Sequence, residues 1–188
     1  MRRLRAHDGA MAGVLLSALA LQACGDTDAD QQESAVEISA PDDWTRSDPE
    51  VTEDVLESLR WKPPGDDGSS LQVVVGCGAD TTADELLEGA MRGERPLPVV
   101  GGVEEPVEVE VAGLDEARQG IFALGPSPDD VGMWMAGLYG VGDDVLVLVE
   151  LVGPRAAFDE EQAEDVLASV SVDTSDLAGQ CAEVEGAS

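Results

Sequence analysis

The sequence has a single histidine, and none after its first cysteine. That histidine is His7, whereas Cys24 is the first of three cysteines. Ser-His-Asp triads, Cys-His pairs and histidine-ligated zinc sites all require an imidazole. An enzyme built from the remaining chain would have to use carboxylates, Tyr139 or an unassisted hydroxyl. No pair of acids has a local sequence that indicates a raised pKa in an apolar pocket. We therefore expect no catalytic residues, no cofactor and no enzymatic activity.

Basic residues are also scarce. The chain has 10 lysines and arginines against 40 aspartates and glutamates, a formal net charge of −30. Arg2, Arg3, Arg5 and one acid, Asp8, precede Cys24, so the chain from there onward carries 7 basic and 39 acidic residues, a formal charge of −32. The phosphates of nucleic acids and anionic lipid headgroups repel such a chain. We expect no nucleic-acid partner.

Long hydrophobic runs are absent as well. The mostly apolar segment Ala10–Leu21 is too short to span a membrane, which takes about 20 apolar residues. Arginines precede it and Leu21-Gln22-Ala23-Cys24 closes it, which together predict an export signal. Leu-x-Ala-Cys resembles the bacterial lipobox, in which the cysteine is diacylated and becomes the first residue. A plain secretory signal would need a small residue in place of Leu21, and an uncleaved anchor would need a longer apolar run.

We therefore expect residues 1–23 to be a lipoprotein signal peptide. Diacylglycerol on Cys24, with acyl chains such as palmitate, would hold the protein on the extracytoplasmic face of the cell membrane, since two chains suffice for stable anchoring. Residues 24–35 are polar and acidic, which predicts a flexible tether. Residues 36–181 have the size of one folded domain. Residues 182–188 are expected to be a disordered tail.

The two remaining cysteines are Cys77 and Cys181. In an oxidising, extracytoplasmic compartment we expect them to form one disulfide. The bridge would close a long loop and stabilise the fold by about 4 to 5 kcal/mol. Two free thiols are the alternative, and a metal site made of two thiolates without histidine is less favoured still.

Acidic pairs occupy predicted turns. Aspartate is common in turns because its side chain accepts hydrogen bonds from nearby backbone N–H groups. Turn chemistry therefore accounts for Asp66-Asp67, Asp129-Asp130 and Asp143-Asp144. Calcium at Asp143-Asp144 is the alternative, because carboxylate oxygens suit that ion. We expect no metal site.

Apolar residues alternate with polar ones, or run continuously, over several short segments that predict strands. These segments are 36–38, 55–61, 71–75, 107–111, 117–124, 133–141 and 145–152. Segment 107–111 has the clearest alternation. Turn residues separate the second segment from the third and the last two from each other, so both pairs are expected to form hairpins.

Two helices are predicted from their starting residues. Thr82 and Glu85 have the capping-box spacing, and Gly93 ends the apolar face that follows. Asp159 and Gln162 repeat the spacing before a second apolar face. The order of strands and helices predicts an α+β domain with a mainly antiparallel sheet flanked by helices.

Three parts of the domain resemble a known family. Residues 38–41 with Trp44 form a strand-proline-tryptophan opening, and residues 109–117 form a strand-glycine-strand hairpin. Residues 145–151 and 159–173 form a closing strand, a helix and a terminal stretch. Together they resemble the PsbP-like family, which includes PsbP of photosystem II and LpqN-type actinobacterial lipoproteins. The resemblance implies an α/β/α sandwich and a non-catalytic role as an assembly factor, accessory subunit or binder.

Aromatic residues make up only 3% of the chain. Trp44, Trp61 and Trp134 are expected mainly to pack in the core. Met133 and Tyr139, together with Trp134, are the exception, because a polarizable cluster beside a loop would suit a ligand groove.

The leading hypothesis is a non-catalytic envelope lipoprotein that binds another envelope protein through its sheet or through the loop over residues 96–105. The alternative is a carrier of a small apolar ligand or lipid, with a pocket between sheet and helix near Met133, Trp134 and Tyr139. A carboxylate-based hydrolase ranks last. An apolar patch would favour the first and a closed pocket the second.

Overall fold

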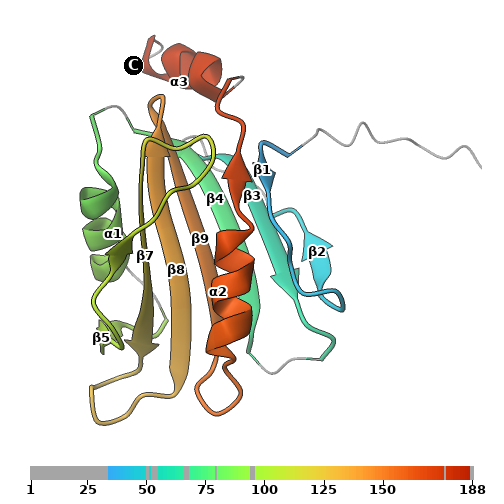
Figure 1. Ribbon diagram of the computed structural model, residues 1–188, viewed down its shortest axis with the longest axis vertical. Helices are drawn as coiled ribbons and strands as arrows, with labels where there is room; N and C mark the ends of the chain where they lie inside the picture. The colour runs from blue at the N-terminus through green and yellow to red at the C-terminus, as the bar shows by residue number, and fades with distance from the viewer. Residues whose placement is uncertain are drawn as a thin grey trace, which may run out of the picture. The chain divides into compact units, whose positions relative to one another are not determined.

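The strand-forming segments assemble into one eight-stranded antiparallel sheet (Figure 1). The computed structural model describes residues 34–49, 51, 55–65, 68–78, 80–93, 96–175 and 177–186. The strands follow the spatial order β2-β3-β4-β9-β8-β7-β5, and β6 also pairs with β7. Their bounds are β2 Thr45–Ser47, β3 Val55–Lys62, β4 Ser70–Cys77, β5 Val99–Gly102, β6 Val107–Glu108, β7 Glu116–Leu124, β8 Met133–Gly142 and β9 Val145–Pro154. Both predicted hairpins, β3–β4 and β8–β9, are confirmed.

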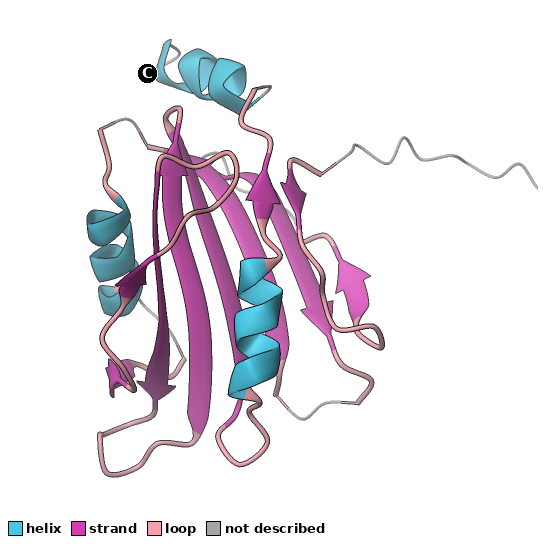
Figure 2. Cartoon of the chain, in the orientation of Figure 1, coloured by secondary structure: helices cyan, strands magenta, loops and turns pink. Residues whose placement is uncertain are grey.

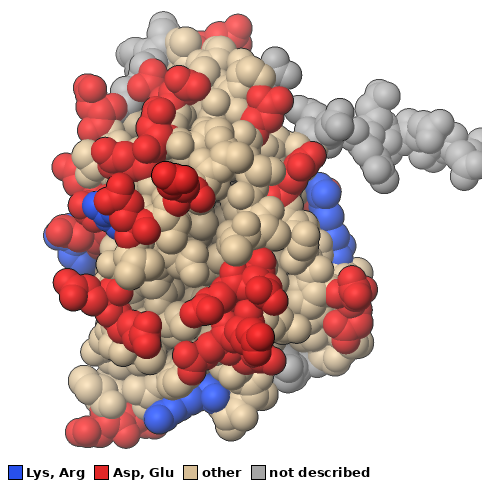
Figure 3. Space-filling model, in the orientation of Figure 1, with Lys and Arg blue, Asp and Glu red and all other residues tan. Residues whose placement is uncertain are grey.

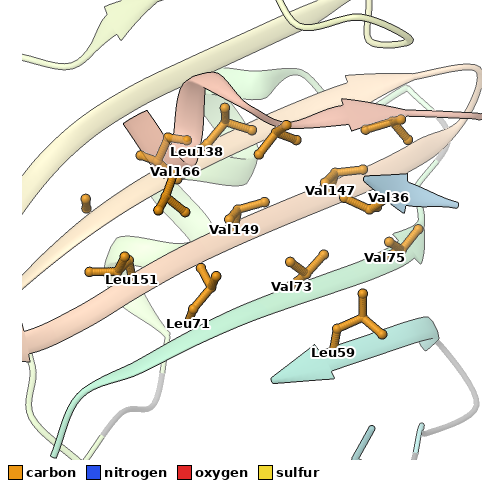
Figure 4. Packing of buried hydrophobic residues seen from close by; sticks show 14 of the residues in the cluster. Val36, Leu59, Leu71, Val73, Val75, Leu138, Val147, Val149, Leu151 and Val166 are labelled. Carbon is orange, nitrogen blue, oxygen red and sulfur yellow. The ribbon is translucent and has the colours of Figure 1, made fainter. Parts of the chain in front are cut away.

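Alternate side chains of the long strands lie on opposite faces of this sheet. In β9, Val145, Val147 and Val149 are fully buried on one face, while Leu148 and Glu150 lie on the other. The first face carries the main core cluster, whose valines and leucines interdigitate across β4, β8 and β9 (Figure 4). The second face carries a smaller buried cluster of Phe122, Leu124, Met135 and Tyr139.

One helix covers each face of the sheet. Helix α1, Ala83–Arg92, packs on the smaller cluster, and α2, Glu160–Ala168, packs on the main cluster. The Thr82 hydroxyl accepts the Glu85 N–H at 3.2 Å, and the Glu85 carboxylate accepts the Thr82 N–H at 3.1 Å. This capping box satisfies two N–H groups at the start of α1. The predicted α/β/α arrangement is confirmed (Figure 2).

The first and last short strands pair beside α2. Strand β1, Val36–Glu37, is antiparallel to β10, Ser171–Val172, and Val36 is buried in the main cluster. Ala35 also packs against that cluster, and its N–H donates to Glu57 Oε2 at 3.2 Å. The folded domain therefore begins before residue 36, the predicted boundary.

The expected strand over residues 107–111 is wrong for most of its length. Only Val107 and Glu108 are paired with β7, although Val109 still donates its N–H to the Ala117 carbonyl at 3.1 Å. Val109 and Val111 pack partly buried against the main cluster. The chain leaves the sheet edge and crosses the face that carries α2 (Figure 1). The valine alternation therefore reflects packing onto that face, because strict pairing along an edge is not needed to bury every second residue.

The predicted disordered tail is also wrong as far as the structure describes it. Residues 182–186 belong to a third helix, α3, Leu177–Gly186. Leu177 and Cys181, four residues apart on one helix face, are buried. Cys181 is joined to Cys77 at the end of β4 with a Cα–Cα distance of 5.3 Å, which confirms the predicted disulfide. The bridge and Leu177 fix the helix onto the domain.

The predicted signal peptide, the predicted acylation site Cys24 and the predicted tether as far as residue 33 lie outside the described residues. Within the described ranges, no helix is both long enough and apolar enough to cross a membrane.

Candidate binding surface

The three residues predicted to line a ligand groove do not lie together. All three are in β8, and strand alternation puts Met133 and Tyr139 on the α1 face and Trp134 on the α2 face. Tyr139 is fully buried, and its hydroxyl donates to Glu150 Oε1 at 3.0 Å. The two grooves described below have none of the three in their lining. Because successive side chains of a strand face opposite sides of the sheet, Trp134 cannot share a groove on one face with Met133 and Tyr139.

The three tryptophan side chains pack against the main core cluster, and their ring faces are not free to stack on a ligand. Trp61 is buried in the main cluster, and Trp44 and Trp134 lie partly buried against it. Trp134 meets Phe158 edge to face with ring centroids 5.9 Å apart. The guanidinium carbon of Arg155 lies 5.6 Å from the Trp134 ring centroid, a cation–π contact that covers the ring.

The acidic pair at residues 143 and 144 makes a tight hairpin turn. Asp143 and Asp144 have φ values of 50° and 64°, the left-handed conformation that a two-residue hairpin loop requires. Asp143 Oδ2 accepts a hydrogen bond from the Thr174 hydroxyl at 3.0 Å. In the described ranges no three acidic, cysteine or histidine side chains gather in a way that could hold a metal ion. Asp66-Asp67 lies outside the described residues.

A shallow apolar cleft lies between α1 and the sheet edge. It has a volume of about 410 Å³, and we call it the α1 cleft. Its lining residues are Leu87, Glu88, Met91, Arg92, Pro106 and Phe122.

The amphipathic pattern of α1 explains the helical wall of the α1 cleft. Leu86, Leu87, Ala90 and Met91 form the apolar face of the helix and pack on the smaller cluster. The other wall depends on Gly120: a Cβ there would lie 2.8 Å from Phe122 Cζ and 3.4 Å from Pro106 Cβ. Glycine therefore leaves room for the Phe122 ring to lie along β7 toward the proline. The sequence identifies the apolar face of the helix, but the pairing of β6 with β7 is what brings Pro106 to that face.

Ion pairs tie the elements around the α1 cleft. Arg118 of β7 donates to Asp84 of α1 at 2.7 Å and to Glu108 of β6 at 3.0 Å. Arg92 donates to Glu88 at 2.7 Å. The hydrogen bond from Arg118 lowers the pKa of Asp84 below its ordinary value. The hydrogen bonds to Asp84 and Glu108 raise the pKa of Arg118. Both arginines are therefore neutralised locally.

The sheet edge beside the α1 cleft exposes apolar side chains. Four large hydrophobic residues are exposed among those described, and three of them belong to residues 97–107, which we call the edge segment. Leu97, Val103 and Val107 have exposed fractions of 38%, 39% and 56%. Val107 pairs with Gln119, whose side chain lies on the α2 face, whereas Pro106 contacts the α1 cleft. The edge segment thus offers apolar groups on both sides of the sheet edge. It overlaps the loop over residues 96–105 that was predicted as a contact surface, and Leu97 and Val103 lie within that loop.

A second, polar groove of about 590 Å³ lies between the chain after β1 and α2. Its lining includes the carboxylates of Asp42, Asp43, Asp159, Glu161 and Asp165. Figure 3 shows the acidic side chains that gather over α2.

Comparison with known proteins supports the architecture. No protein-family model and no curated protein matches the sequence. The fold is similar to the solution structure of cyanobacterial PsbP (CyanoP) from a Synechocystis species, with a TM-score of 0.54 and 12% identity over 74% of this chain and 87% of that one. A crystal structure from Bacteroides thetaiotaomicron matches with a TM-score of 0.44 and 12% identity over 76% of this chain, which spans 46% of that protein. The folded domain has a PsbP-like fold, as the sequence motifs implied.

Proposed function

We propose that this chain is a membrane-anchored extracytoplasmic lipoprotein whose PsbP-like domain binds another protein of the cell envelope without catalysing a reaction. The lipobox-like sequence ending in Cys24 supports the anchor. The Cys77–Cys181 disulfide supports an oxidising compartment, because such bridges persist mainly outside the cytoplasm.

The exposed apolar edge segment carries the proposal of a binding function. Leu97, Val103 and Val107 contribute apolar surface to solvent that folding of the domain does not bury. Exposed apolar groups gathered in one place mark protein-interaction sites more often than isolated ones do. The α1 cleft beside them is shallow and open, which suits the side chains of a docked protein better than an enclosed small ligand.

Site-specific photo-crosslinking tests the binding function. A photoreactive phenylalanine analogue would be placed at 97, 103 or 107 in the bacterium that makes the protein. The control position is Thr45, which is exposed in β2 at the opposite edge of the sheet. We expect the three edge positions to yield one adduct of the same mass and Thr45 to yield none. The proposal fails if no adduct forms or if Thr45 gives the same one.

The adduct also tests the non-catalytic role. The crosslinked protein would be identified, purified and mixed with the native chain. We expect it to bind again and to keep its mass, since a binding module leaves its partner unmodified. A change in the partner's mass that depends on the chain would contradict the proposal.

Anchoring has a separate test. Cys24→Ser removes the proposed acylation site. We expect the native chain to sediment with membranes and to carry diacylglycerol mass on Cys24, and the variant to lose both properties. A variant that stays in the membrane fraction would argue against anchoring through Cys24.

A further inference from the structure

We propose that the α1 cleft binds a protein segment in which one large apolar side chain is flanked by lysine or arginine. This inference rests on the proposed function and adds the chemistry of the partner. The side chain would enter between α1 and the edge segment. The basic residues would face the acidic groups around the α1 cleft.

The shape of the α1 cleft sets the apolar part of the partner. Leu87, Met91, Pro106 and Phe122 line it with carbon and sulfur. Its volume of about 410 Å³ fits one or two large side chains, such as leucine or phenylalanine, and not a helix bundle face. Methionine adapts to differently shaped apolar partners, because its side chain is unbranched and polarizable.

The charge of the surface indicates which residues flank the apolar side chain of the partner. Glu88 lines the α1 cleft, Arg118 holds Asp84 of α1 and Glu108 of β6, and Glu104 and Glu105 directly precede the lining residue Pro106. Arg92 and Arg118 are the arginines described on this surface, and both are engaged by carboxylates. Among the described residues named here, carboxylates outnumber arginines. Partner specificity at such a surface follows from opposite charge, which also speeds association.

Glu104 and Glu105 are available to a bound segment. Both are exposed, and neither forms an ion pair with another described residue. They precede Pro106, which lines the α1 cleft. Basic side chains of a bound segment would therefore reach them while the apolar side chain occupies the α1 cleft.

Other occupants fit the same surface less well. A second copy would bring another acidic chain of net charge −30 against this one, and anionic lipid headgroups would be repelled for the same reason. Addition of a strand to β5 is also disfavoured. The pairing of β5 with β7 is irregular between Val99 and Gly101, and Pro106 has no N–H to offer.

Selection from a random peptide library tests the chemistry. The exported full chain would be solubilised in detergent and immobilised through Lys62, its only lysine, which is exposed in β3 near the opposite edge of the sheet. A library of random 12-residue peptides displayed on phage would be selected on it at low salt. Peptides that also bind the variant Met91→Ser would be discarded, because that variant keeps the charge of the surface and removes part of the apolar lining.

We expect the surviving peptides to share one large apolar residue with lysine or arginine on both sides. Their affinity should fall about tenfold with Glu104→Lys combined with Glu105→Lys. The matched control is Glu160→Lys combined with Glu161→Lys, the same charge change at exposed positions of α2 on the other face. It should leave the affinity within about twofold.

Three results would overturn the inference: surviving peptides without basic residues, equal loss of affinity in the control, or no peptide that distinguishes the native chain from Met91→Ser. Circular dichroism would first establish that Met91→Ser is folded. Otherwise Pro106→Ser, which also removes part of the apolar lining and leaves the charge unchanged, would replace it. Adducts at the edge segment with failure here would leave a binding module with a different partner chemistry. Failure of both experiments would remove the proposed function itself.

Discussion

Gly137 provides a stringent test of the packing beneath α1. It lies buried in the middle of β8, between Gly120 of β7 and Glu150 of β9. A Cβ at this position would lie 2.6 Å from both Cε2 and Oη of Tyr139 and 2.8 Å from Cζ. Carbon atoms in contact normally lie 3.5–4.0 Å apart. Gly137→Ala therefore requires the Tyr139 ring to move by roughly 1 Å.

That movement is resisted from two directions. The Tyr139 ring meets Phe122 edge to face at 6.4 Å, and its hydroxyl is bonded to Glu150 at 3.0 Å. Overpacking a core costs about 1 to 3 kcal/mol, and losing a hydrogen bond to a charged group costs about 1.5 to 3 kcal/mol. Alanine recovers about 0.5 to 1 kcal/mol of glycine's backbone entropy. The structure adopts whichever of these two responses costs less free energy, so we expect Gly137→Ala to lower the free energy of unfolding by about 2 kcal/mol.

Urea denaturation followed by tryptophan fluorescence measures this loss. In a domain of this size, about 2 kcal/mol corresponds to a melting temperature lower by about 4 to 8 °C. The matched control is Gly101→Ala in β5, where an added Cβ has no heavy atom within 4 Å. We expect it to stay within about 0.5 kcal/mol of the native chain.

A double-mutant cycle assigns the loss to the ring. In the Tyr139→Leu background, Gly137→Ala should change the free energy of unfolding little, because the ring atoms that would clash with the added Cβ are absent. Two results would refute the reasoning: equal effects of the alanine at 137 and at 101, or an undiminished cost at 137 after the ring is removed.

The remaining predictions concern the disulfide, α1 and an ion pair. Replacing Cys77 and Cys181 by alanine should lower the free energy of unfolding by about 4.7 kcal/mol, because the bridge joins residues 104 apart; a loss under about 1 kcal/mol in urea would contradict this. Gly89→Ala, with no heavy atom near the added Cβ, should stabilise exposed α1 by about 0.5 to 1 kcal/mol in thermal melting, and a lower melting temperature would count against it. Arg118 lowers the pKa of Asp84 in the folded state, so in acid the unfolded chain binds more protons at Asp84 than the folded chain does. The stabilisation by this ion pair is therefore present above about pH 4, and it is lost as the pH falls through the folded pKa of Asp84. Asp84→Asn should therefore flatten the melting curve against pH between about pH 2 and pH 5 at low salt; parallel curves would contradict this.

Local signals in the sequence account for the elements that were predicted. The spacing of Thr82 and Glu85 is read within one turn of helix, and the structure has that capping box. Gly142-Asp143-Asp144 needs only the conformational preference of its own residues to form the β8–β9 hairpin. Such features are decided by neighbours in sequence, so a single sequence contains them.

Features that depend on distant segments escaped prediction. Val109 and Val111 alternate like strand residues, yet the chain buries them by crossing the α2 face. Residues 182–186 continue a helix that Leu177 and Cys181 hold against the domain, and the local sequence of these residues does not predict that contact. The separation of Trp134 from Met133 and Tyr139 has a local cause. The alternation of a strand was available from the sequence, and applying it would have separated Trp134 from the other two.

The α1 cleft combines both kinds of information. Leu87 and Met91 are recognisable as an apolar helix face, whereas Pro106 joins them only through the pairing of β6 with β7. A chain with 40 acidic and 10 basic residues attracts any cationic segment, so charge alone cannot select a partner. Selection requires an uncharged feature that most basic segments lack. The apolar lining of the α1 cleft is such a feature, and this is why loss of specific binding in Met91→Ser, with charge unchanged, is the decisive result for the proposed surface.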